Sequence, residues 1–213
     1  MTQSFEAHLT DSETLAGHLL DHAAWSAARP VQLIHYWSGE PAPPERQASV
    51  RSIWTQETLC IRFDCSQREP LVLNSEPQTI KKTIGLWERD VCEIFIAPDI
   101  DEPKRYFEFE AAPTGEWLDL KINQMADKRE TGWEFSSGMT VATRVENELV
   151  IIAMSIPFDT FGRVPKLGER WRTNMFRCIG SGETRGYLAW QPTRTERPNF
   201  HVPQVFGWLC FVE

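Results

Sequence analysis

The stretch Asp90–Ile96, DVCEIFI, decides the fold of this 213-residue chain, because its residues alternate in character over seven positions. Side chains of a β-strand point alternately to opposite faces, so Cys92 and Ile94 share one face while Glu93 lies on the other. Aliphatic and aromatic residues of the kind that fill this stretch favour strands. The pattern predicts a strand with one wholly apolar face and a carboxylate on the opposite face.

The next segment, Arg105–Ala111, repeats this alternation as RYFEFEA. Phe107 and Phe109 fall on one face, whereas Glu108 and Glu110 fall on the other with Tyr106. A polar loop joins the two segments, which is typical of an antiparallel pair. If the strands pair, Glu93 and either Glu108 or Glu110 line one concave surface.

Similar strand patterns continue on both sides of this pair, separated by short turn signals. The other predicted strands are Val31–Tyr36, Ala48–Trp54, Thr58–Asp64, Trp117–Ile122, Met139–Val145, Glu148–Ile156, Arg170–Ile179, Tyr187–Trp190 and Phe206–Val212. Helix is expected only as a short segment within Thr10–Ala28 and one turn at Phe158–Phe161. About ten strands with regular turns predict an all-β, antiparallel β-sandwich.

Length and charge restrict the partners of the chain. Residues 1–213 fit a single domain, with residues 1–20 as an N-terminal extension. Thirty acidic against 22 basic residues give a net charge of -8, which argues against a nucleic-acid partner. The absence of any apolar run near 18 residues argues against a membrane span. Met1–Leu20 does not resemble a signal peptide, so a cytoplasmic location is expected, or secretion if a leader was removed.

Familiar catalytic motifs are absent from the sequence: it has no G-x-S-x-G, no P-loop and no H-E-x-x-H. Five cysteines without a C-x-x-C predict neither a zinc ribbon nor a dithiol redox site, and they are expected to be buried apolar residues. Cys60 and Cys65 lie close enough in sequence to bridge across a turn, although a cytoplasmic location disfavours a disulfide.

Tryptophan is unusually informative because nine are present. A sandwich buries most large rings between its layers, but Trp87 and Trp190 stand at strand ends beside polar segments. Rings in such positions can stack on the apolar face of a sugar ring. The alternative is that both belong to the rim of the core.

The carboxylates leave three functions open. Glu93 with Glu108 or Glu110 can accept hydrogen bonds from sugar hydroxyls, which predicts non-catalytic carbohydrate binding. The same pair could serve as the acid and the nucleophile or base of a glycoside-active enzyme. A solvated polar face, with exposed aromatic residues meeting a protein partner, is the third alternative.

Several ordered segments together resemble family 9 carbohydrate-binding modules. They are Ala24-Trp25, Leu86–Phe95, Tyr106–Glu110, Pro113–Gly115, Ser155–Phe158, Trp171–Asn174 with Arg177, Ala189–Pro192, Phe200–Pro203 and Phe206-Gly207. The resemblance spans about residues 20 to 213. It implies a β-sandwich that binds a small carbohydrate or a polysaccharide chain end between two tryptophans.

Carried over by position, the resemblance implies that Trp87 and Trp190 stack on the sugar and that Glu93 binds its hydroxyls. Further ligand contacts are expected from Glu108, Glu110, Asn174, Arg177 and His201. The residue types at 108 and 110 differ from those usual in the family, which leaves the preferred sugar open.

Of these residues, His201 is expected to pack at the foot of the site with a ring nitrogen hydrogen-bonded to protein. The segment that contains it runs into the closing strand, which favours an anchoring role over direct contact with the ligand.

No cofactor is required for such a function, although the resemblance makes structural calcium an option. Asp99, Asp101 and Glu102 are the candidate calcium ligands, without an EF-hand pattern. A second, DOMON-type group of sandwiches is also similar and includes haem binders. Haem would need axial ligands, for which His201 and Met154 are available, but nothing in the sequence pairs them.

Overall fold

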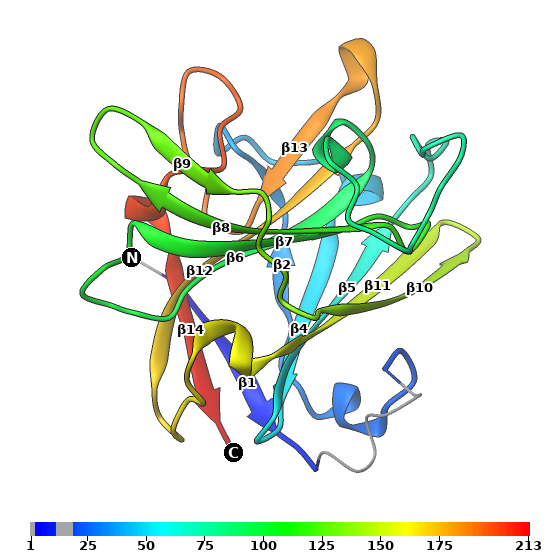
Figure 1. The fold of residues 1–213 in the computed structure, drawn as a ribbon. Coiled ribbons are helices and arrows are strands. Elements are labelled where there is room, and N and C mark those ends of the chain that lie inside the picture. The colour runs from blue at the N-terminus through cyan, green and yellow to red at the C-terminus, as the bar shows by residue number, and fades with distance from the viewer. Residues whose placement is uncertain (1–2, 12–18) are drawn as a thin grey trace.

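The computed structural model describes residues 3–11 and 19–213, and there the chain is built almost entirely from β-strands. Figure 1 shows them wrapped into a sandwich-like structure. The strands are β1 (Ser4–Leu9), β2 (Val31–Leu33), β3 (His35–Tyr36), β4 (Ala48–Trp54), β5 (Thr58–Ser66), β6 (Val91–Ala97), β7 (Arg105–Ala111), β8 (Trp117–Gln124), β9 (Arg129–Gly132), β10 (Thr140–Glu146), β11 (Leu149–Pro157), β12 (Arg170–Ile179), β13 (Gly186–Ala189) and β14 (Gly207–Val212). The all-β sandwich class predicted from sequence is confirmed, with more strands than expected.

One hydrogen-bonded path connects these strands in the order β10-β11-β5-β4-β1-β14-β12-β6-β7-β8-β9. Beside it, β2 pairs with β4, and β13 pairs with both β12 and β3. The predicted pairing of the strands that carry Glu93 and Glu108 is confirmed, because β6 and β7 are antiparallel neighbours. Strands β4 and β5, and likewise β10 and β11, also pair antiparallel across short connections.

The strand β1 departs from prediction in two respects. It runs parallel to both of its neighbours, with Phe5 opposite Leu209 of β14 and Ala7 opposite Ser52 of β4. The sheet is therefore mixed rather than wholly antiparallel. Assigning residues 1–20 to an extension outside the sandwich is wrong for Ser4–Leu9, because Phe5 and Ala7 are fully buried. Its partners lie far away in sequence, so local pattern does not reveal this pairing.

The main core lies between the two layers of the sandwich. Strand β5 contributes Ile61 and Phe63 from one layer, and Ile94 of β6 and Phe109 of β7 meet them from the other. A second apolar cluster covers the opposite face of the β6–β7 layer and includes Phe95. Because β6 is buried on both faces, any polar side chain on it lies in a dry environment.

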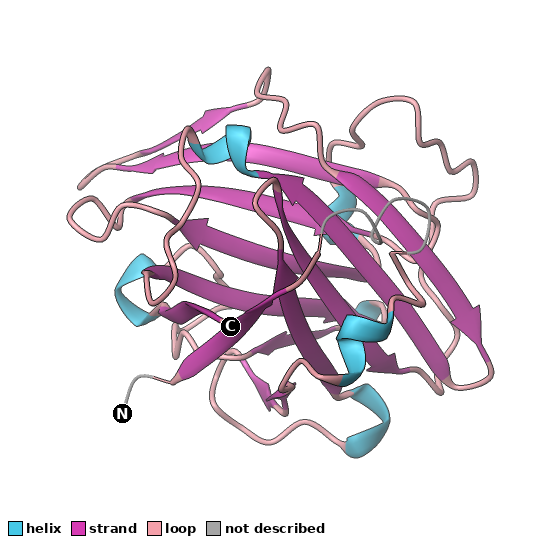
Figure 2. Cartoon of the chain, turned by 90° about the horizontal axis from the view of Figure 1, so that it is seen from below, coloured by secondary structure: helices cyan, strands magenta, loops and turns pink. Residues whose placement is uncertain are grey.

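Helical structure in the described residues consists of 3-10 turns of three or four residues. They are η2 (Ala23–Ser26), η3 (Pro44–Arg46), η4 (Leu86–Glu88), η5 (Phe158–Phe161), η6 (Gly182–Thr184) and η7 (Pro203–Val205). Figure 2 shows them as short coils among the connections between strands. The turn at Phe158–Phe161 is confirmed, while part of the helix expected within Thr10–Ala28 lies outside the described residues. None of the described helices has the length and apolar character needed to cross a membrane.

The cysteines are free thiols, and four of them are buried as predicted, with Cys210 half-buried. A bridge between Cys60 and Cys65 does not fit the structure. Both belong to β5 at positions of opposite parity, so their side chains point to opposite faces. Cys65 instead faces Cys92 across the core, with 3.4 Å between the two sulfur atoms.

Candidate functional site

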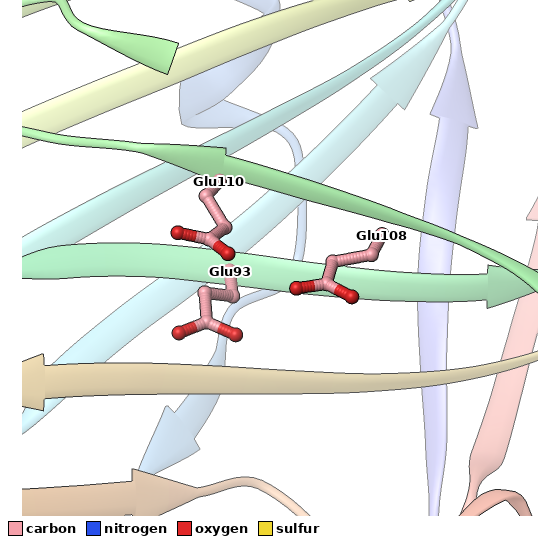
Figure 3. A group of neighbouring side chains, drawn as sticks. All are labelled: Glu93, Glu108 and Glu110. Atoms are coloured by element: carbon pink, nitrogen blue, oxygen red, sulfur yellow. The ribbon is translucent and has the colours of Figure 1, made fainter. Parts of the chain in front are cut away.

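Three glutamates converge on the face of the β6–β7 pair that is turned away from the main core. Glu93 lies directly opposite Glu110, and Glu108 lies opposite Phe95, two residues further along. One carboxylate oxygen of each glutamate lies within 4.8 Å of the others. Figure 3 shows the three side chains leaving the two strands on the same side. The gathering of carboxylates predicted from the period of two is confirmed.

All three carboxyl groups are buried, with exposed fractions of 2% for Glu93, 4% for Glu108 and zero for Glu110. Burial, followed by the charge of Glu108, raises the pKa of Glu93 to about 8. Burial raises the pKa of Glu108 to about 7. Burial and the charges of its two neighbours raise the pKa of Glu110 well above its ordinary value. Protons therefore stay on this cluster at pH values where exposed glutamates are ionised.

The cluster is poor in hydrogen-bond donors. Within the described residues, no donor outside the cluster reaches Glu108 Oε2 or either carboxylate oxygen of Glu110, and a hydrogen bond between Glu108 and Glu110 forms when one of them is protonated. Glu93 Oε1 accepts a weak bond from the thiol of Cys178, at 3.4 Å. Leaving a buried acceptor unpaired costs about 1–3 kcal/mol, so a ligand that brings donors or positive charge is favoured here.

A cavity of about 480 Å³ opens above Glu93 and Glu108, with Glu110 behind them. Aromatic side chains form much of its wall. Trp87 and Trp133 stand side by side at its mouth, with ring centroids 6.4 Å apart and planes inclined by 43°. Both rings remain accessible, with exposed fractions of 36% and 45%. The lining also includes Leu120, Ile122, Arg129, Tyr187, Phe200 and His201.

A buried side chain and hydrogen bonds to its backbone hold the turn that carries Trp87. Gly85 takes a left-handed backbone conformation, with φ of 81°, and directs the chain into η4. Leu86 is fully buried and anchors that turn in the second apolar cluster. Arg185 donates to the backbone oxygen of Trp87 at 2.6 Å and to that of Arg89 at 2.9 Å. The exposed ring of Trp87 is therefore presented by a fixed backbone.

His201 lines the cavity next to Glu108. Its Nδ1 is 2.9 Å from the hydroxyl of Tyr106, and its Nε2 is 3.9 Å from Glu108 Oε2. The imidazole also packs on Phe95, with ring centroids 5.1 Å apart. Burial lowers the pKa of His201 to about 3, so the ring is neutral at physiological pH. The predicted hydrogen bond to protein is confirmed.

The His201→Ala variant is expected to lose about 1–3 kcal/mol of unfolding free energy, because the buried Tyr106 hydroxyl loses its partner. Binding of a ligand in the cavity should weaken by less than about tenfold. Urea unfolding and calorimetric titration measure the two effects. Complete loss of binding with unchanged stability would instead make His201 a principal ligand contact.

Trp190 does not take the position predicted for it. Its ring belongs to the main core, is 2% exposed and packs near Phe5, with centroids 6.2 Å apart. Gly207 leaves it space, since a Cβ on that glycine would lie 2.3 Å from the ring. The stacking role expected of Trp190 does not fit this placement, because the alternation along β13 turns it inward while Ala189 faces outward.

Asn174 and Arg177 are also away from the cavity. Asn174 is fully buried and exchanges hydrogen bonds with the backbone of Gln191. Arg177 donates to the backbone oxygens of Arg46 and Ser66, at 2.7 and 2.8 Å. Their polar groups are committed to joining strands and loops, so the ligand contacts predicted for them do not fit the structure.

The acidic loop before β7 stands apart from this site. Asp99 accepts a hydrogen bond from the backbone of Asp101, and Glu102 forms an ion pair with Arg105 at 2.6 Å. A structural calcium ion at these residues stays a prediction. The residues considered for haem are separated by the sheet, because Met154 lies in the main core and His201 in the cavity on the other face.

Trp133 is the principal residue that sequence reasoning missed. It follows the strand β9 and sits in the polar sequence Glu130–Glu134, the same kind of setting that drew attention to Trp87. Arg129 and Tyr187 also reach the cavity. An exposed aromatic residue among charges was a usable signal, but its distance from Trp87 depends on the β8–β9 hairpin folding over the site.

The comparisons with known proteins agree with this fold. Residues 17–213 match the family model described as carbohydrate family 9 binding domain-like, so the chain belongs to that family. The match includes every residue that forms the cavity. The class of protein predicted by resemblance is thereby confirmed.

Individual relatives are distant in sequence. A protein of Arthroderma benhamiae called "Extracellular protein" is 24% identical over 183 residues, covering 79% of this chain and 80% of the relative. A provisionally assigned carbohydrate-binding protein from Bacteroides uniformis superposes with a TM-score of 0.73 at 20% identity, covering 99% of this chain and 100% of that one. These comparisons give no support to the cytoplasmic location expected from sequence.

Two further similar structures are complexes of a family 9 carbohydrate-binding module from Caldicellulosiruptor kristjanssonii. The complex with cellotriose has a TM-score of 0.67 at 11% identity, covering 99% of this chain and 94% of the module. The complex with glucose has a TM-score of 0.64 at 12% identity, covering 97% and 95%. At such low identity these likenesses establish the shared fold.

Proposed function

We propose that the cavity binds a sugar ring without transforming it, either in a small saccharide or at the end of a polysaccharide chain. One observation carries the proposal: two exposed tryptophans and the carboxyls of Glu93 and Glu108, including a buried Glu108 oxygen without a donor, border the same cavity. A sugar ring offers both of the missing partners, since its C–H face suits an indole and its hydroxyls are donors.

The dimensions and chemistry of the cavity support this ligand class. A volume of about 480 Å³ lies within the range usual for small-ligand sites, which combine apolar walls with a few fixed polar groups. Trp87 and Trp133 supply the apolar wall. Glu93 and Glu108 supply carboxyl oxygens that accept hydrogen bonds from sugar hydroxyls, and a protonated carboxyl can also donate one.

Similar proteins also support a carbohydrate ligand. Modules with the same fold are bound to cellotriose and glucose, which favours glucose-type rings as first ligands to test. The relative called extracellular favours a role outside the cell for this protein too. The carbohydrate is the partner proposed for the cavity.

The enzymatic alternative is the weaker one. The raised pKa values of Glu93 and Glu108 suit a general acid, but glycosidases place their two carboxyls on opposite sides of the bond they cleave. In this cavity the carboxyls leave the same face of two neighbouring strands and line one wall. Binding without turnover fits that arrangement better.

Titration with glucose, cellobiose and cellotriose is expected to change the tryptophan fluorescence saturably, because Trp87 and Trp133 become covered. The same samples should release no nitrophenol from aryl glycosides between pH 5 and 9. Turnover that disappears in Glu93→Gln would contradict the binding proposal in favour of an enzyme. No fluorescence or calorimetric response to a broad sugar array would contradict both and leave a protein partner as the ligand.

A further inference from the structure

We propose that Glu93, Glu108 and Glu110 form a binding site for one hard divalent cation, such as Ca²⁺ or Mn²⁺, at the buried end of the cavity. No other group of three or more acidic, cysteine or histidine side chains in the described residues is placed closely enough to share an ion. The site lies on paired strands rather than on a loop, so its ligands are held in register.

The separation of the oxygens suits a shared ion. Calcium binds oxygen ligands at about 2.3–2.6 Å, so two of its ligands lie no more than about 5 Å apart. One oxygen from each glutamate meets that limit, with all three within 4.8 Å of one another. Direct cross-strand pairing brings Glu93 to Glu110, and the next outward-facing position on β7 adds Glu108.

Charge balance points the same way. Three carboxyls occupy a dry site, and the nearest guanidinium groups are engaged or exposed. Arg185 bonds to the backbone oxygens of Gly180, Trp87 and Arg89, and Arg129 lies exposed on β9. The charges of Arg185 and Arg129 act on Glu93 and Glu108 without a direct contact, and a divalent ion would supply positive charge in direct contact with the carboxylate oxygens.

The oxygens of the cluster that lack an outside donor are a second sign of a missing partner. Glu108 is 4% exposed, lines the cavity and has an Oε2 that no donor outside the cluster reaches, and Glu110 has two such oxygens. A ligand set made of carboxylate oxygens selects hard cations over soft ones such as Cu⁺.

A second step rests on the proposed function. Three carboxylate oxygens leave a six- to eight-coordinate ion with open positions. Those positions lie toward the cavity, where two adjacent hydroxyls of a sugar stacked on Trp87 can replace water. The cation would then contact the sugar directly, and sugar affinity would depend on it.

The test uses the full chain, freed of metal with EDTA and dialysed. Binding of Mn²⁺ is followed without sugar by the loss of the free-ion electron paramagnetic resonance signal, and Ca²⁺ is added as competitor. Glu108→Gln and Glu110→Gln remove ligand charge while keeping side-chain shape. Glu102→Gln, in the exposed loop before β7, is the matched control. Circular dichroism and the melting temperature check folding.

Wild type and Glu102→Gln are expected to bind one Mn²⁺ per chain, displaced by Ca²⁺, and both glutamate variants should bind more than about tenfold more weakly. A rise in melting temperature with Ca²⁺ should occur in wild type, so the site remains testable even if a variant fails to fold. Absence of saturable binding up to about 1 mM, or unchanged affinity in Glu110→Gln, would overturn the site.

Sugar titrations separate the two steps. Sugar affinity that falls in EDTA and returns with Ca²⁺ supports direct contact between cation and sugar. Sugar affinity that is equal with and without the ion overturns that contact but leaves the cation site to the Mn²⁺ result. No sugar binding in either condition counts against the proposed function, whereas Mn²⁺ binding still decides the cation site.

Discussion

The Trp190→Ala variant is expected to lose roughly 3–5 kcal/mol of unfolding free energy, a cost typical of truncating a buried indole. The ring is 2% exposed in the main core and stands against Phe5, and the adjoining Gly207 leaves no atoms able to fill the space. Alanine therefore leaves a cavity between the layers. Urea unfolding followed by circular dichroism measures the loss.

The conservative Trp190→Phe variant is the matched control for Trp190. It keeps an aromatic ring in the core and should lose less stability, while its sugar affinity should equal that of wild type because position 190 does not line the cavity. A Trp190→Ala protein as stable as wild type but unable to bind sugar would restore the stacking role predicted from sequence.

The Glu93→Gln variant is expected to be more stable than wild type at alkaline pH by roughly 3–5 kcal/mol. The pKa of Glu93 is raised to about 8 in the folded state, from an ordinary value of 4.5. Its contribution to stability is therefore complete below about pH 4.5 and is lost as pH rises through 8, at up to about 1.4 kcal/mol per pH unit. Glutamine stays neutral and escapes this loss.

Unfolding free energies of wild type and Glu93→Gln between pH 6.5 and 8.5, with EDTA present, test this effect. Above pH 6.5 the opposite contribution of His201, whose pKa is lowered to about 3, is fully present and constant. Other titratable or charged groups around Glu93 are Glu108, Glu110, Cys178 and Arg185. Parallel pH profiles for the two proteins would show that Glu93 is already ionised without cost.

The glutamate cluster could be predicted from sequence because its causes are local. A period of two sets which residues of each strand share a face, and the short polar loop sets which strands pair. With those two facts, Glu93, Glu108 and Glu110 must lie on one surface. The burial of these glutamates could not be predicted from sequence, because it depends on the hairpin β8–β9 and the segment around His201 covering that surface.

The features that sequence patterns predicted wrongly or missed depend on contacts between residues distant in sequence. Pairing of β1 with β14 joins residues about 200 positions apart, and a short alternating segment does not reveal its partner. The Trp190 ring lies in the core because it follows β13 on the side that faces Gly207. The sequence at the end of this strand does not specify that side. Trp133 reaches Trp87 only because β9 folds back along β8.

Calorimetric titration of cellobiose or cellotriose tests most directly whether Trp87 and the buried glutamates bind a sugar ring. Trp87→Ala should weaken binding by more than about 30-fold, as expected for a stacking ring at an interaction hot spot. The control Trp208→Ala removes an indole that packs on Arg170 and Arg172 outside the cavity, and it should bind like wild type. Equal affinities for wild type and a folded Trp87→Ala protein would contradict the account.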